Sequence, residues 1–125
     1  LLIDRNSGNT AITQISQFGQ QNYKKKCAII IFPEGTRSNS SSLSPFKMGG
    51  LKALINSMPN VLIVPFVVHN NYQIFEEGIF PLKLRNHLKY SVLDSFNPKD
   101  LDVDTLKDKL ESLFLNELNK FPRSR

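Results

Sequence analysis

Two continuous apolar segments constrain the fold of this chain most strongly. Residues 27–32, CAIIIF, and residues 61–68, VLIVPFVV, contain no charged or hydroxyl-bearing side chain. Strands buried on both faces have this composition, and they occur in parallel sheets that helices cover on both sides. We therefore expect two buried strands, with Pro65, late in the second, marking a sheet edge or a strand end.

The segments before and between these runs predict an α/β fold. Residues 1–4, LLID, have the pattern of the end of a buried strand, and residues 10–23 place Ile12, Ile15 and Phe18 on one helical face. The order of strand, helix and strand forms a β-α-β unit, whose crossover should be right-handed and whose strands should be parallel. The sequence thus predicts a mostly parallel sheet flanked by helices.

Further elements are expected downstream. Residues 46–58 and 102–121 each carry an apolar helical face, and the second of these helices ends with Lys120, which complements its dipole. Residues 84–96 have a weaker strand pattern. The chain has 125 residues and starts at Leu1 rather than a methionine, so we expect one domain or a piece of one, and favour a piece.

Composition excludes several classes of protein. With 40% hydrophobic and 22% charged residues the chain is an ordinary globular one. Its net charge of +5 favours an anionic partner or reflects only a solvated surface. The apolar runs fall far short of the roughly 18 residues that a membrane-spanning helix needs, and no signal peptide is evident. Cys27 has no partner for an internal disulfide, which fits a reducing compartment, and two scattered histidines predict no metal site.

Residues with binding chemistry follow the predicted strand at 27–32. In FPEGTRS, residues 32–38, Gly35 would let the backbone approach a ligand closely, and Arg37 offers a planar fork of donors for two phosphate oxygens. Ligands of α/β proteins bind at such strand ends. Arg5 holds the matching position after the first strand. We therefore expect both arginines to bind one dianion, with Glu34 orienting one of them.

Other interpretations of these residues stay open. Glu34 and Arg37 could form only a surface ion pair in an ordinary turn, worth about 0.5 kcal/mol. A nucleotide site lacks support, because the chain has neither a GxxxxGK[ST] nor a GxGxxG motif. Nucleic-acid binding is disfavoured, since the basic residues are dispersed and the aromatic residues have core spacing. We assign the basic triplet at residues 24–26 to the C-terminal end of the first helix.

Several motifs together resemble a known family. IDR at residues 3–5, FPEGTRS at 32–38 with PFKMGG at 45–50, and IVPFVV at 63–68 resemble, in order and spacing, three of the four motif blocks of the lysophospholipid acyltransferase family, above all the 1-acyl-sn-glycerol-3-phosphate acyltransferases. The resemblance covers about residues 1–72. It implies a glycerol-phosphate acyltransferase-like α/β fold, truncated at the N-terminus, with residues 1–125 as the C-terminal part of a single acyltransferase domain.

The resemblance also implies a function. Enzymes of this family, which serve phospholipid biosynthesis, move an acyl group from acyl-CoA or acyl-carrier protein to the free hydroxyl of lysophosphatidate, with no resident cofactor. Carried over by position, Arg5 and Arg37 would bind the substrate phosphate, and the pocket would be shaped by Glu34, Gly35, Thr36 and Pro65. A membrane-associated protein on the cytoplasmic face is implied, touching the membrane through a missing N-terminal part and binding no nucleic acid.

The fourth motif block, His-x-x-x-x-Asp, has no counterpart in this chain. Its histidine acts as general base on the acceptor hydroxyl. Five positions after His69 stands Ile74, and five after His87 stands Val92, so neither histidine has the required acid. A non-catalytic phospholipid-binding module, which would keep both arginines without a base, stays open as an alternative. For the enzyme, we expect the catalytic His and Asp upstream of Leu1 and no activity from the fragment alone.

Overall fold

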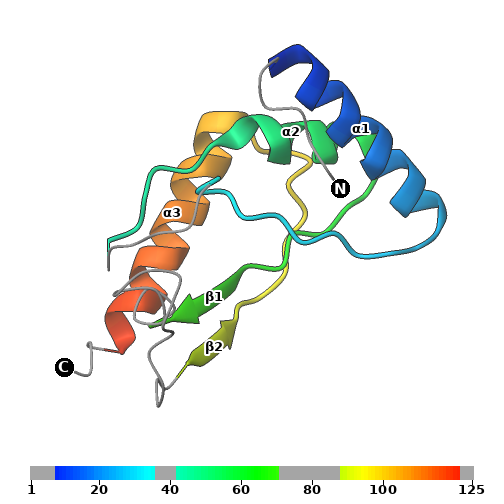
Figure 1. Ribbon diagram of the computed structural model, residues 1–125. Helices are drawn as coiled ribbons and strands as arrows, with labels where there is room; N and C mark the ends of the chain where they lie inside the picture. Colours follow the sequence, from blue (N-terminus) through cyan, green and yellow to red (C-terminus); the bar gives the residue numbers. More distant parts are fainter. Residues whose placement is uncertain (1–7, 36–41, 71–87, 122–125) are drawn as a thin grey trace, which may run out of the picture.

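Three helices and two strands form the described part of the chain. The computed structural model describes residues 8–35, 42–70 and 88–121. In chain order these residues form α1 (Gly8–Lys24), α2 (Met48–Ser57), β1 (Phe66–His69), β2 (Lys89–Val92) and α3 (Val103–Lys120). Figure 1 shows α1 beside α2 at one end of the molecule, with α3 running alongside the two strands.

The helices confirm the sequence prediction, since each predicted helix overlaps an observed one. Helix α3 begins where Asp102 caps it. Asp102 Oδ1 accepts hydrogen bonds from the backbone N–H groups of Asp104 at 3.0 Å and Thr105 at 2.9 Å. Hydrogen bonds from the side chain and backbone of Thr105 lower the pKa of the Asp102 carboxyl, because they stabilise its charged form. Asp102 is therefore the N-cap residue of α3, and aspartate is one of the residues preferred at this position.

The two strands form one antiparallel pair. Phe66 on β1 lies opposite Val92 on β2. Further along, Ile63 and Phe96 form an isolated bridge, in which each backbone N–H donates to the other residue's carbonyl at 2.9 and 3.0 Å. Strands are therefore present in the predicted regions 61–68 and 84–96, but they pair as one antiparallel ribbon rather than parallel. The prediction that 61–68 is buried on both faces is wrong, because Leu62, Val64 and Phe66 are exposed and the described residues cover only the other face. Among the described residues this ribbon is the whole sheet.

Residues 27–32 differ from the prediction. They pair with no other strand in the described ranges. Ile31 packs against the core and approaches α2 at Gly50, but Ile30 and Phe32 are 84% and 75% exposed. The prediction of a strand buried on both faces is wrong here, because the helices cover this segment from one side only. The predicted first strand, residues 1–4, lies outside the described residues, so the parallel pairing and right-handed crossover stay predictions.

The hydrophobic core lies between α2 and α3. Its buried members are Phe46, Met48, Leu51, Leu106 and Leu110. Phe46 also meets Phe114 of α3 edge to face, with ring centroids 5.2 Å apart. The backbone N–H of Phe46 donates to Glu111 Oε1 of α3 at 2.8 Å. Phe46 therefore holds the chain that enters α2 against α3 by both apolar packing and a hydrogen bond.

A buried polar network joins α3 to the sheet. His69 on β1 and Glu117 on α3 are both buried. His69 Nε2 lies 3.0 Å from Ser91 Oγ on β2, and the Ser91 hydroxyl also bonds to the Glu117 carboxylate. Lys120 Nζ donates to Glu117 Oε2 at 2.7 Å, and the ring of Phe121 meets His69 edge to face. Since the polar atoms are paired, their hydrogen bonds offset the cost of burying them, and the network fixes α3 on the strands.

Gly19→Ala should destabilise the protein at the contact between α1 and α2. A methyl group at position 19 would overlap Ser57 Oγ and lie 3.2 Å from Leu54 Cδ2. Either the Ser57 hydroxyl must rotate away from its hydrogen bond to Leu54 O or the helices must separate, at a cost of about 1–3 kcal/mol. Gly49→Ala in α2 is the control, because nothing lies within 4 Å of its new methyl group. Urea unfolding measures both variants. An unchanged midpoint for Gly19→Ala would contradict this packing.

The network around Glu117 should make stability depend on pH. The hydrogen bond from Lys120 and then that from Ser91 hold the pKa of Glu117 below its ordinary value of 4.5. A depressed carboxyl pKa contributes stability that is fully present above the unfolded value and is lost as pH falls through the lower folded value. Glu117→Gln should therefore flatten the loss of stability on acidification below pH 4.5, measured by thermal unfolding at a series of pH values.

The control for this pH series is Asp108→Asn, which removes an exposed carboxylate from the same helix. If Glu117→Gln and Asp108→Asn change the acid limb of the stability curve equally, the network does not hold Glu117 as the structure indicates.

Candidate functional site

Two hydrogen bonds join residues 33–34 of the FPEGTRS segment to residues 44–47 before α2, at the base of the 36–41 loop. The backbone N–H of Lys47 donates to the carbonyl of Pro33 at 2.7 Å. Glu34 Oε2 accepts a hydrogen bond from the backbone N–H of Ser44 at 3.0 Å. Both bonds join residues on either side of the 36–41 segment, so the two ends of this loop are held in a fixed relation. Glu34 thus links the two described ends of the segment 36–41.

Gly35 and Lys47 make a close contact within this base. Gly35 has φ of +71°, a conformation that side chains other than glycine's adopt with strain, and its N–H donates to Phe32 O at 3.0 Å in a tight turn. A Cβ at position 35 would lie 3.0 Å from Lys47 Cδ and 3.5 Å from Lys47 Nζ. The Lys47 side chain therefore lies over Gly35, and its ammonium group stands beside the turn. Glycine is required here for both its conformation and its lack of a side chain.

The direction of Lys47 follows from the core. Phe46 is buried against α3, and in the extended chain before α2 successive side chains point to opposite sides. Lys47 consequently projects outward, and it is exposed. Among the residues that the structure describes, no carboxylate forms an ion pair with it. A lysine whose backbone is fixed at the turn, and whose ammonium group has no described counter-ion, can bind an anion at this position.

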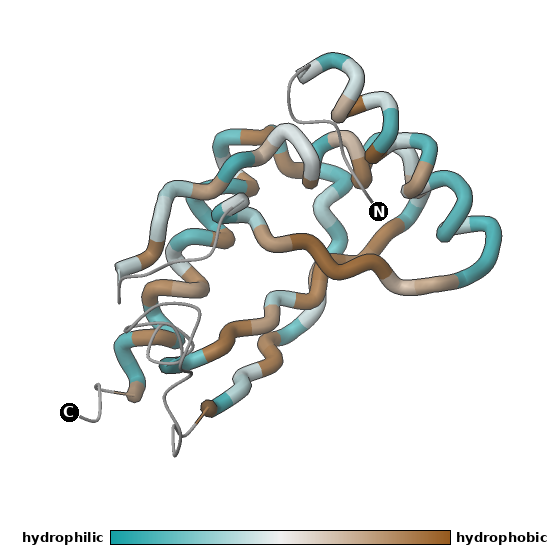
Figure 2. The backbone as a smooth tube through the Cα atoms, viewed as in Figure 1, coloured by the Kyte–Doolittle hydropathy of each residue, from teal (hydrophilic) through white to brown (hydrophobic). Residues whose placement is uncertain are grey.

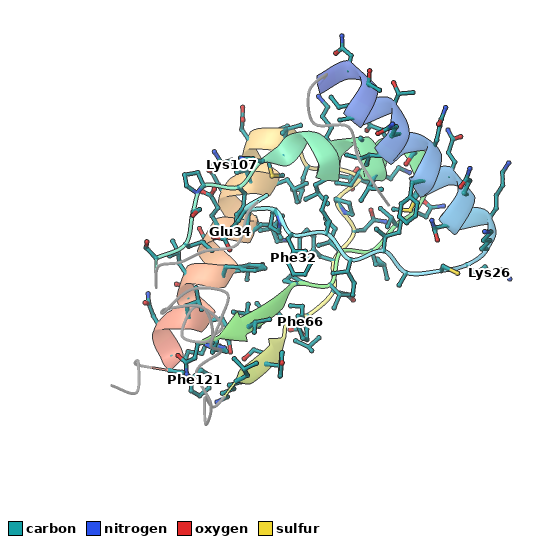
Figure 3. The ribbon with its side chains drawn as sticks, in the orientation of Figure 1. Lys26, Phe32, Glu34, Phe66, Lys107 and Phe121 are labelled. Carbon is teal, nitrogen blue, oxygen red and sulfur yellow. The ribbon has the colours of Figure 1, made fainter. Side chains whose placement is uncertain are left out.

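The structure describes only part of the residues predicted for this site. Arg5, Thr36 and Arg37 lie outside the described residues, so the shared arginine pocket is not tested. Glu34 and Gly35 lie in the turn as expected, and Figure 3 labels Glu34 near the end of the segment that follows Phe32. Pro65 is buried just before β1, where its carbonyl accepts the N–H of Leu93 at 2.9 Å. Its contribution to a ligand pocket stays a prediction.

Lys47 is the site residue that the sequence interpretation missed. The PFKMGG motif belongs to the family resemblance, but the resemblance implies no role for its lysine. A signal existed, because a buried aromatic residue followed by a lysine directly before a helix predicts an inward and then an outward side chain. The contact with Gly35 could not be foreseen, since it depends on how the two ends of the loop return to each other.

The described residues offer no candidate general base. His69 is buried at the far end of β1, with Nε2 engaged by Ser91, and is not part of the turn at Gly35. His87 lies outside the described residues. Within residues 8–35, 42–70 and 88–121, no group of three acidic, histidine or cysteine side chains could hold a metal ion. No helix in these ranges is long and apolar enough to cross a membrane.

Comparison with known proteins places the motifs in context. The family model described as Acyltransferase matches residues 1–69, which include all the motif blocks named above. The 1-acyl-sn-glycerol-3-phosphate acyltransferase beta of Homo sapiens is 33% identical over 129 residues, covering 97% of this chain and 45% of that protein. The 1-acyl-sn-glycerol-3-phosphate acyltransferase of Saccharomyces cerevisiae is 32% identical over 139 residues, covering 98% and 45%.

A solved structure has the same fold. The crystal structure of the 1-acyl-sn-glycerophosphate acyltransferase PlsC from Thermotoga maritima superposes with a TM-score of 0.69 at 18% identity, covering 87% of this chain and 46% of that one. This likeness confirms the predicted α/β acyltransferase fold class. The chain spans less than half the length of each of these three proteins.

Proposed function

We propose, from the premise that this chain belongs to the acyltransferase family, that it forms the part of a 1-acylglycerol-3-phosphate acyltransferase that holds the phosphate of the acceptor. In this reaction the hydroxyl of lysophosphatidate attacks an acyl thioester, the thiol leaves, and phosphatidate is formed. The observation that carries the proposal is the base of the 36–41 loop, where Lys47 lies over Gly35.

Charge and geometry support a phosphate ligand at this place. Lys47 supplies an ammonium group beside the turn, and Arg37 follows Gly35 by two residues, within the loop that Glu34 and Ser44 brace. Helix α2 starts at Met48, directly after Lys47, so the positive end of its dipole adds to the same field. A phosphate dianion would gain charge-assisted hydrogen bonds from both side chains. We propose Arg5 as a third cation of the same site.

The chemical step needs a base that the described residues do not supply. We propose that the general base, a histidine with an acid five positions later, belongs to a longer polypeptide that contains this chain, since its relatives are more than twice as long. The base would take the proton of the acceptor hydroxyl as it attacks the thioester carbonyl. Accordingly, the 125-residue chain alone should hold the phosphate without transferring an acyl group.

Substrate and location follow from this chemistry as parts of the proposal. The acceptor is a lysophospholipid that resides in a membrane, and the donor is acyl-CoA or acyl-carrier protein. We propose that the complete protein acts at the cytoplasmic face of a membrane. The acyl donor is present on that side, and anionic lipids there attract a basic protein surface. The net charge of +5 suits an anionic headgroup region.

A chimera tests the proposal. In it, this chain replaces the matched 45% of the Saccharomyces cerevisiae relative, which then supplies the remaining part of the enzyme. Acyl transfer to lysophosphatidate is expected from the chimera, and none from the 125-residue chain. Arg37→Ala should lower kcat/KM by about 30- to 1000-fold, equivalent to roughly 2–4 kcal/mol, because a bidentate charged contact is lost. Arg37→Lys should recover only part of the lost kcat/KM, since lysine lacks the planar fork of donors that arginine has.

Background hydrolysis of the thioester is the internal control for this experiment. Water replaces the phosphorylated acceptor there, so the rate should change far less in the arginine variants. If folded Arg37→Ala transfers acyl groups to lysophosphatidate at close to the parent's efficiency, the phosphate role of Arg37 is wrong.

Lys47→Ala in the same chimera should raise the KM for lysophosphatidate and lower kcat/KM by about 10- to 100-fold, because one charged hydrogen bond to the phosphate is lost. Lys47→Arg keeps the charge and should retain most of the efficiency. Lys52→Ala is the matched control, since Lys52 is an exposed lysine within α2. Equal effects of Lys47→Ala and Lys52→Ala would show a general loss of positive charge rather than a specific contact.

A further inference from the structure

One face of the antiparallel ribbon carries apolar side chains that nothing described covers. Along the chain leading into β1, Leu62, Val64 and Phe66 are exposed, while Pro65 and Val67 are buried. This alternation is that of a strand with one face on a core and the other face open. In an antiparallel sheet that faces water, the exposed face carries polar side chains. Here the exposed side chains are apolar.

The neighbouring segments continue this open face. Tyr90 and Val92 of β2 lie on the same side of the ribbon as Phe66, and the rings of Phe66 and Tyr90 stack with centroids 5.6 Å apart. Ile31 and Ile63 both pack against the helical core, so Phe32, next to Ile31, points away from it like Leu62 and Val64. We call this set the bare face: Phe32, Leu62, Val64, Phe66, Tyr90 and Val92.

Helix α3 lies on the opposite side of the ribbon, where it contacts β1. Val67, on the side of β1 that is covered, is 2% exposed, whereas Val92 of the bare face is 65% exposed. Figure 2 shows continuous apolar stretches along the segment before the FPEGTRS turn and along the chain entering β1, with the helices to one side of them. No member of the bare face carries a charge. An apolar, uncharged surface of this extent is a site of contact with another apolar surface.

We propose that the bare face is the docking surface for apolar segments of the same longer polypeptide, which cover it as α3 covers the other side of the ribbon. The lengths support this occupant, because this chain accounts for only 45% or 46% of the relatives and of the solved structure, leaving more than half of each to form a second layer. Sheets of α/β proteins are covered on both faces. The inference rests on family membership and fold, not on the phosphate chemistry.

Other occupants fit the bare face less well. An anionic membrane surface attracts lysine and arginine, and none belongs to this set. A second copy of the chain would bring two identical apolar faces together, but would leave no surface for the remainder of a polypeptide of the relatives' length. Both occupants are distinguishable outcomes of the following experiment.

Hydroxyl-radical labelling measures the accessibility of single side chains in the 125-residue chain and in the chimera. Phe32, Phe66 and Tyr90 should react freely in the chain alone and roughly fivefold or more slowly in the chimera, since a buried side chain loses contact with solvent. Tyr23 of α1 is the control, because it is exposed and lies outside the bare face, and its labelling should be equal in both proteins. Labelling requires no catalytic activity.

Three results would overturn the proposal. Equal labelling of Phe66 and Tyr90 in the chain and in the chimera would mean that the longer polypeptide leaves the face uncovered. Protection in the chain alone that increases with protein concentration would identify a second copy as the occupant. Protection of the chimera only after anionic phospholipid vesicles are added would identify a lipid surface.

A second measurement needs no chimera. Val92→Asp in the 125-residue chain should leave the melting temperature within about 2 °C, because the side chain is not part of this chain's own core. Val67→Asp, on the covered side, is the matched comparison and should abolish cooperative unfolding. If Val92→Asp unfolds the chain as Val67→Asp does, the bare face belongs to the core of this chain and the proposal fails.

Discussion

The packing of Phe46 against α3 is the interaction on which the rest of the structure depends. Its ring lies in the core between α2 and α3, and its N–H bonds to Glu111. These contacts fix where α2 begins, and they turn the next residue, Lys47, outward over Gly35. The same side chain therefore supports the hydrophobic core and positions the cation beside the FPEGTRS turn. Phe46 therefore contributes both to the stability of the fold and to the position of the proposed binding site.

Local signals in the sequence predicted the helices, but not the burial of the segment at residues 27–32. Apolar periodicity and the Asp102 cap depend on near neighbours, so the helices could be read directly from the sequence. Whether Ile30 and Phe32 are buried depends on a second layer, and the described residues provide helices on one side only. The motif resemblance identified the family correctly. The contact between Lys47 and Gly35 was not predictable, because it depends on the three-dimensional arrangement of residues on either side of the segment 36–41.

The described residues separate two tasks of the proposed enzyme. Glu34, Gly35 and Lys47 form the turn proposed to hold the phosphate, while His69 is committed to a buried network that secures α3. Under this proposal the chain, which spans less than half the length of its relatives, supplies the phosphate site, and residues outside it supply the proton transfer. The uncovered apolar face fits the same division, since it offers a surface on which the remaining part of a longer polypeptide can pack.

The most direct measurement of the central claim compares two acceptors in the chimera, lysophosphatidate and a monoacylglycerol that lacks the phosphate. The ratio of their kcat/KM values reports how much the phosphate contributes to recognition. Combining Lys47→Ala with Arg37→Ala should reduce this ratio by about 100-fold or more, because two charged contacts to the phosphate are removed while transfer to the neutral acceptor is little changed. A double variant that is folded and keeps the parent's ratio would contradict the account.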